Sequence, residues 1–84
     1  MIQFDEYEIK ARRLSEIRKA RFKVENDLRR VGIWYYSTLI RQWEGFHFYT
    51  LIVKLESLEQ ENQVAVVLDL DAPEMTTFVN SKSE

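Results

Sequence analysis

The side chains that could do chemistry in this chain are few and lie apart. There is one histidine, His47, and there is no cysteine. A nucleophile needs a base within hydrogen-bond reach, usually with a third group that orients the base. His47 lies inside an aromatic segment, where we interpret it as a packed or interface histidine. We therefore expect no catalytic residues and no enzyme activity.

Metal and cofactor binding are not expected either. Asp69 and Asp71 lie two positions apart on one face of a predicted strand and, with Glu74, could hold a divalent cation weakly. An acidic edge that discourages association between sheets is the interpretation we adopt. Gly32 and Gly45 are too far apart to build a phosphate-binding loop or a dinucleotide fingerprint. The sequence thus predicts no metal and no cofactor.

The charged residues are unevenly distributed, and one group of them could bind a polyanion. Residues 8–31 carry nine Lys and Arg against four Asp and Glu, whereas residues 43–84 carry two against eight. On a helix drawn through residues 5–31, four basic residues fall within a sector of about 40°. This basic ridge consists of Arg12, Lys19, Lys23 and Arg30. It could follow nucleic-acid phosphates, or it could be a solvated helix face with locally paired charges.

Length and composition predict one folded domain over residues 1–84, with 45% hydrophobic and 31% charged residues. A chain of this size hides only roughly 60–70% of its unfolded surface, so association would stabilise it. The N-terminus has acids where a signal peptide would have a basic start and an apolar run. No apolar run reaches the roughly 18 residues of a membrane span. We expect a soluble, cytoplasmic protein without a membrane partner.

A helix over residues 5–31 is the first predicted element. Asp5 and Glu8 have the spacing of a capping box, and Gly32 can end the helix in a left-handed conformation. Six apolar residues form one stripe at helical spacing, opposite the basic ridge. They are Tyr7, Leu14, Ile17, Val24, Leu28 and Val31.

Three strands are predicted after the helix, over residues 33–42, 46–55 and 63–70. The letters WEG form a Gly-containing turn between the first two strands, and SLEQENQ is a polar break before the third. A short helix or turn is expected within residues 71–78, followed by a frayed tail at residues 79–84. The predicted fold class is α+β: an N-terminal amphipathic helix on a three-stranded antiparallel sheet, αβββ, with a short C-terminal helix.

The aromatic segment 33–53 raises the question of what covers the sheet. It holds seven of the eleven aromatic residues, and alternation points bulky side chains to both faces of its strands. One helix covers one face, and the other would be a larger apolar patch than a monomer usually tolerates. A second copy of the chain is the cover that we predict. The predicted dimer or partner interface consists of Tyr35, Leu39, His47, Tyr49, Leu51 and Val53.

Two other covers remain open: the C-terminal segment with Met75 and Phe78, or a different protein. The function that follows is a small non-enzymatic protein-interaction module, acting as a homodimer. It would be an adaptor, regulator or inhibitor of a macromolecular partner. The alternative function is nucleic-acid binding through the basic ridge.

Overall fold

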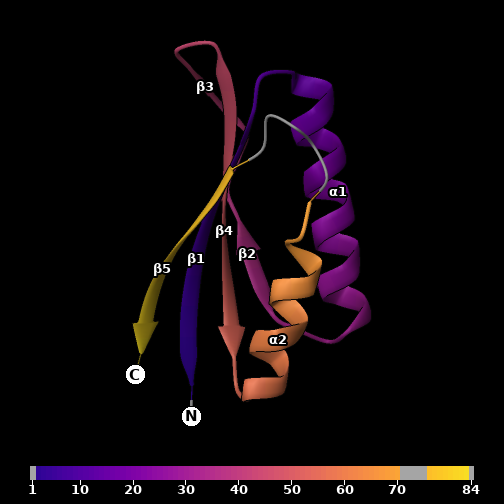
Figure 1. The fold of residues 1–84 in the computed structure, drawn as a ribbon, viewed down its shortest axis with the longest axis vertical. Coiled ribbons are helices and arrows are strands. Elements are labelled where there is room, and N and C mark those ends of the chain that lie inside the picture. Colours follow the sequence, from indigo (N-terminus) through magenta and orange to yellow (C-terminus); the bar gives the residue numbers. More distant parts are fainter. Residues whose placement is uncertain (1, 71–75, 84) are drawn as a thin grey trace.

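The computed structural model describes residues 2–70 and 76–83, and it has two helices against one antiparallel sheet (Figure 1). The α+β class is therefore confirmed. The elements follow one another as β1 (Gln3–Ala11), α1 (Leu14–Arg30), β2 (Tyr35–Ser37), β3 (Arg41–Trp43), β4 (Phe46–Leu55), α2 (Leu58–Val67) and β5 (Thr76–Ser83). Neither helix of the described residues is long and apolar enough to cross a membrane.

The sheet has the strand order β2-β4-β1-β5, with β3 also paired to β4. β2 lies beside residues 51–53 of β4, and β3 lies beside residues 46–48. The two short strands are therefore two parts of one interrupted edge strand. In the centre, β1 and β4 pair along their length, with Gln3 opposite Leu55 and Ala11 opposite His47.

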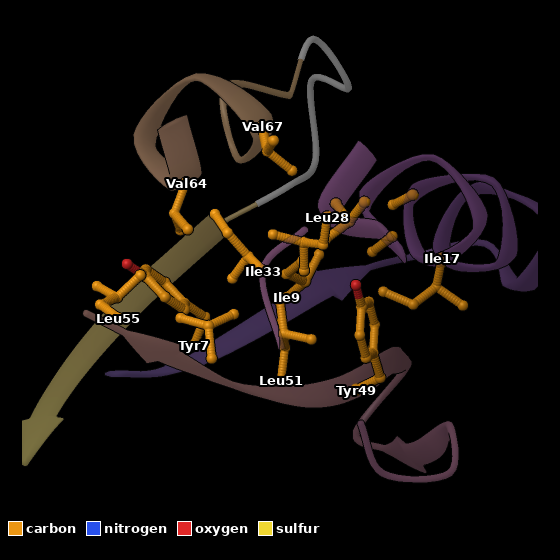
Figure 2. Close-up of a cluster of buried hydrophobic side chains, with 14 residues drawn as sticks. Tyr7, Ile9, Ile17, Leu28, Ile33, Tyr49, Leu51, Leu55, Val64 and Val67 are labelled. Atoms are coloured by element: carbon orange, nitrogen blue, oxygen red, sulfur yellow. The ribbon is translucent and has the colours of Figure 1, made fainter. Parts of the chain in front are cut away.

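Both helices lie on the same side of the sheet (Figure 1). The core forms between this layer and the sheet, where α1 and α2 point Ile17, Leu28, Val64 and Val67 toward the strands (Figure 2). The side chains of α1 that are buried follow helical spacing: Ile17, Ala20, Val24 and Leu28. No helix of the described residues lies over the other face of the sheet (Figure 1).

The prediction of a helix over residues 5–31 is wrong for its first third, which forms β1. Tyr7, Ile9 and Ala11 alternate with polar residues and are buried, which is the period of a strand. Asp5 is not a helix cap. It is buried in the strand and accepts hydrogen bonds from the Gln3 side chain (2.7 Å) and the Tyr7 hydroxyl (3.3 Å).

The predicted end of the helix is confirmed at Gly32, which has a φ of 75°. The N–H of Gly32 donates to the carbonyl of Arg29, and that of Ile33 donates to the carbonyl of Leu28 (3.0 Å). These two bonds satisfy carbonyl groups that the last turn leaves without helical partners. The basic residues of that turn, Arg29 and Arg30, also suit the negative end of the helix dipole.

The third predicted strand, residues 63–70, is wrong because most of it belongs to α2. The hydroxyl of Ser57 accepts a hydrogen bond from the Gln60 backbone N–H (3.2 Å), and the Gln60 side chain accepts one from the Glu56 N–H (2.7 Å). This reciprocal pattern starts a helix. It overrides the β-branched residues of the VAVV stretch, of which Val64 and Val67 face the core.

The predicted strand over residues 46–55 is confirmed as β4, whereas residues 33–42 form the short β2, a loop and the first two residues of β3. The predicted WEG turn is also confirmed. Glu44 (φ 48°) and Gly45 (φ 82°) both have positive φ angles, as the tight turn of a two-residue hairpin requires.

The C-terminal prediction is wrong where the structure describes it. Residues 76–83 form β5, which pairs with β1 along the edge of the sheet, in place of a tail at residues 79–84. This strand widens the sheet, so it does not fold across the face without helices. Residues 71–75, part of the predicted short helix, lie outside the described residues.

Candidate protein-interaction surface

Most of the predicted interface residues lie in the core. Tyr49, Leu51 and Val53 have no exposed surface, and Figure 2 shows the first two within the core cluster. Tyr35 is partly buried on the same side, and its hydroxyl donates to the Glu25 carboxylate on α1 (3.4 Å). The interface prediction therefore selected the face that the helices cover.

The other two predicted interface residues lie apart from these four. Leu39 is 79% exposed in the loop between β2 and β3. His47 is partly buried and pairs with Gln42 in the β3–β4 hairpin. The six residues do not form one continuous surface.

The sheet face opposite the helices, which we call the open face, carries the exposed aromatic residues. Trp34, Tyr36 and Trp43 are 54%, 59% and 66% exposed. Among the residues whose side chains the structure describes, alternation and register place thirteen on this face. They are Phe4, Glu6, Glu8 and Lys10 from β1, Phe46, Phe48, Thr50, Ile52 and Lys54 from β4, and Trp34, Tyr36, Arg41 and Trp43 from the interrupted edge.

Aromatic rings and cations contact one another on the open face. The rings of Phe4 and Trp34 pack edge to face with centroids 6.5 Å apart, and the rings of Phe46 and Phe48 are 6.3 Å apart. The Lys10 ammonium lies 4.6 Å from the centroid of the Phe46 ring. Such cation–π contacts hold charged groups against an apolar surface without an ion pair.

Two pockets lie on the open face, one at its Trp34 end and one between its middle and Trp43. One, of about 430 Å³, is lined by Phe4, Trp34, Lys54 and Glu56. The other, of about 280 Å³, is lined by Glu8, Arg41, Trp43 and Phe48. Each combines two aromatic rings with a cation and a carboxylate, so each could take an aromatic or aliphatic side chain that carries a polar end.

Arg41 contacts three side chains in the middle of the open face. Its guanidinium contacts the Glu8 carboxylate (3.1 Å), the Thr50 hydroxyl (3.2 Å) and, at 5.9 Å, the centroid of the Phe48 ring. The ion pair joins the edge strand to β1 across β4. It compensates the charge of Glu8 within the chain.

The basic ridge is divided in the structure. Lys19, Lys23 and Arg30 lie on α1, but Arg12 precedes the helix and its guanidinium stacks over the Phe46 ring (4.6 Å). Asp27 forms ion pairs with both Lys23 (3.0 Å) and Arg30 (3.1 Å). The hydrogen bond from Lys23 and the nearby Arg30 charge lower the pKa of Asp27, whose carboxylate therefore stays ionised and neutralises part of the ridge.

The outer surface of α1 holds one large apolar side chain among its cations. Phe22 is 71% exposed and lies one helical turn from Arg18 and Lys19. Sequence analysis assigned no role to Phe22.

Metal-ligating side chains do not gather in the part of the chain that the structure describes. Asp69 is exposed just after α2, and Asp71 and Glu74, its predicted companions, lie outside the described residues.

Sequence analysis missed the β1 side chains of the open face because it placed residues 5–31 in a helix. The signal was present in the strict alternation of Glu6, Glu8 and Lys10 with Tyr7 and Ile9. A second signal lies in β4. The buried side is uniformly apolar apart from one histidine and one tyrosine hydroxyl, whereas the open side contains Thr50 and Lys54.

Comparisons with known proteins identify the fold alone. No family model and no curated protein matches the chain. Among solved structures, the de novo designed protein Foldit4 has a TM-score of 0.81 at 14% identity, covering 100% of this chain and 99% of the design. The uncharacterized protein TM1266 from Thermotoga maritima has a TM-score of 0.56 at 15% identity, covering 99% of this chain and 100% of that one.

A further design, LFR1 1, is described as having a ferredoxin fold, and it matches with a TM-score of 0.62 at 14% identity over 100% of this chain and 87% of its own. The β1-α1-β2/β3-β4-α2-β5 order of the present chain agrees with the βαββαβ arrangement of that fold class. Similarity of this kind defines an architecture, which hosts many unrelated functions.

Proposed function

We propose that the protein is a non-enzymatic protein-interaction module that works as a homodimer through the open face. The observation that carries the proposal is the exposure of Trp34, Tyr36 and Trp43 on a sheet face that no described element covers. The interface thus moves from the residues predicted by the sequence to the opposite side of the same strands.

The composition of the open face favours a protein partner. Aromatic and Arg side chains are enriched in protein interfaces, and the described side chains of this face include six aromatic residues together with Arg41 and Ile52. Its centre carries Glu6 and Glu8, which would repel the phosphates of a nucleic acid crossing the sheet.

The size of the open face also suits a dimer. At ~3.3 Å per residue and ~4.8 Å between strands, a ten-residue strand in a sheet four strands wide gives a flat area of roughly 600 Å². Standard interfaces bury about 800 Å² of accessible surface per partner, and side-chain relief adds to the flat area. Face-to-face packing would leave the helices outside, where a macromolecule that the module adapts, regulates or inhibits would bind.

The proposal is tested by sedimentation equilibrium of the wild type and two lysine variants. Ile52→Lys introduces a charge at the centre of the open face, and Val66→Lys introduces the same charge at an exposed apolar position of α2. We expect a dimer of the 10.1 kDa chain for the wild type and for Val66→Lys, and a folded monomer for Ile52→Lys. A monomeric wild type at micromolar concentration would overturn the proposal.

Nucleic-acid binding through α1 is the second candidate function, and the exposed Phe22 beside Arg18 and Lys19 is the observation that favours it. Cations that follow a backbone and an aromatic ring on which a base can stack are features of single-strand binding. Lys19→Glu should lower the salt concentration that elutes the protein from immobilised single-stranded DNA. Lys54→Glu makes the same charge change on the opposite side and should have less effect; equal effects of the two variants, or no retention of wild type at low salt, would exclude this function.

A further inference from the structure

The charges on the open face of β1 are arranged symmetrically about Glu8. Glu6 lies two residues before Glu8 and Lys10 two residues after it. Within the described part of the chain, neither Glu6 nor Lys10 forms an ion pair. Their Cα atoms are about 13 Å apart along the extended strand, so the two side chains cannot pair with each other. Among the residues whose side chains the structure describes, each is therefore a partly buried charge without an ion-pair partner.

The neighbouring strands show the same arrangement about Thr50, which pairs with Glu8. On β4, Ile52 and Phe48 are two residues from Thr50 on either side, and Lys54 and Phe46 are four residues from it. Along the edge strand, Tyr36 pairs with Ile52 and Arg41 pairs with Phe48. If a second copy were laid on this face with its strands running in the opposite direction, an aliphatic side chain would therefore meet an aromatic ring, a cation would meet an aromatic ring, and an acid would meet a base.

From this pattern we propose that the partner on the open face is a second copy whose strands run antiparallel to those of the first. This inference rests on the proposed function. A two-fold axis crosses the strands at Thr50 and Glu8, so that Glu6 pairs with the partner's Lys10 and Lys10 with the partner's Glu6. The same rotation sets Lys54 against the partner's Phe46, Ile52 against the partner's Phe48, and Trp34 against the partner's Trp43.

The other face-to-face arrangement has its two-fold axis along the strands and is less complementary. It places β1 over the partner's β4, so that residues that pair within the sheet also lie opposite each other across the interface. Glu6 then lies against the partner's Ile52, and Glu8 lies against the partner's Thr50. Glu6 would then be covered by an aliphatic side chain, and a covered charge without a counter-charge is strongly unfavourable. In the antiparallel arrangement the two Glu8 carboxylates meet near the axis, but each is already paired with Arg41 in its own chain.

A charge exchange between two variants tests the antiparallel arrangement. Glu6→Lys places two cations against two cations in a homodimer, and Lys10→Glu places two carboxylates against two carboxylates. We expect each variant alone to dissociate at least tenfold more readily than wild type, and an equimolar mixture to form a heterodimer within about threefold of the wild-type affinity, since a tenfold change corresponds to 1.4 kcal/mol. Native mass spectrometry with one variant ¹⁵N-labelled distinguishes the heterodimer from the homodimers.

A crosslinking measurement keeps the test decisive if either charge variant folds poorly. The chain has no cysteine, so Thr50→Cys and Lys54→Cys each supply a single thiol. Stacked sheets lie about 10 Å apart, so a short bis-maleimide should join Thr50→Cys chains across the axis and leave Lys54→Cys chains, which the rotation separates, unlinked.

The outcomes separate this inference from the proposed function. If the wild type is dimeric but the mixture forms no heterodimer, the antiparallel arrangement is wrong. It is also wrong if the two cysteine variants crosslink equally. Neither result would contradict the proposed function as an interaction module. A monomeric wild type would overturn both. A heterodimer that forms only from the mixture would support both.

Discussion

The hydroxyl of Tyr49 is the buried side-chain oxygen that makes no hydrogen bond among the residues that the structure describes. Its ring fills the core between β4 and α1, and the Arg21 guanidinium lies 5.9 Å from the ring centroid. A buried polar atom without a partner carries a desolvation penalty of about 1–3 kcal/mol. Burial of the Tyr49 ring thus stabilises the fold, whereas burial of its hydroxyl oxygen destabilises it.

Replacing this tyrosine with phenylalanine should therefore stabilise the protein. We expect Tyr49→Phe to raise the free energy of unfolding by about 1 kcal/mol, because the ring stays and the penalty disappears. Urea unfolding measures the change. Tyr7→Phe is the matched control: its hydroxyl donates to the buried Asp5, so its loss should destabilise. A destabilised Tyr49→Phe would show that this hydroxyl has a partner.

The two buried tyrosines also predict loss of stability at alkaline pH. Burial, with the nearby charge and hydrogen bond of Asp5, raises the pKa of Tyr7 to about 12, and burial raises the pKa of Tyr49 as well. The ordinary tyrosine pKa is 10.0. Below this value both the folded and the unfolded chain keep their protons, so the full stability is present. Between about pH 10 and 12 only the unfolded chain loses them, so the free energy of unfolding falls as pH rises.

Urea midpoints at about pH 9 and about pH 11 check this dependence, which should be weaker in Tyr49→Phe because one raised pKa is removed. An equal decline in wild type and Tyr49→Phe would contradict the assignment of the effect to Tyr49.

At the scale of the elements, α2 depends on its first turn. The side chains of Ser57 and Gln60 satisfy backbone N–H groups at the helix start. We expect Ser57→Ala to lower the free energy of unfolding by about 1 kcal/mol, as is usual for the loss of an N-cap. Ser15→Ala, at an exposed position inside α1, is the control and should change stability by less than about 0.5 kcal/mol. Thermal unfolding compares the two, and equal effects would contradict a capping role.

The elements also show how far local sequence patterns determine this fold. β4 and the Glu44–Gly45 turn could be predicted because alternation and turn chemistry agree there. The end of α1 at Gly32 could be predicted for the same reason. α2 was misread because VAVV favours strand locally, although the capping pair Ser57 and Gln60 was visible in the sequence.

β1 was misread for a different reason. Tyr7 has the heptad spacing to Leu14, so the helical period of α1 extends by coincidence into a strand. α1 itself begins at Leu14 after Arg13, which makes no side-chain capping bond, so no sequence signal marked the boundary. Alternation over Glu6–Lys10 was the competing signal, and pairing with two neighbouring strands decided the outcome.

At the scale of the whole molecule, the sequence correctly indicated an α+β fold with more apolar sheet surface than one helix could cover. It could not indicate which face the helices take, because both faces of residues 46–55 are rich in large side chains. The second helix and β5 complete a βαββαβ arrangement in which both helices lie on one side (Figure 1). The candidate site follows from that topology, since it is the face that the described elements leave uncovered.

Tryptophan fluorescence is a direct probe of the open face, because both tryptophans of the chain, Trp34 and Trp43, lie on it. The first measurement is therefore tryptophan emission with acrylamide quenching across a dilution series. We predict blue-shifted, protected emission at high protein concentration that becomes red-shifted and readily quenched on dilution, in step with the change in mass. Emission that is exposed and readily quenched at every concentration would contradict the claim that a second copy covers the open face.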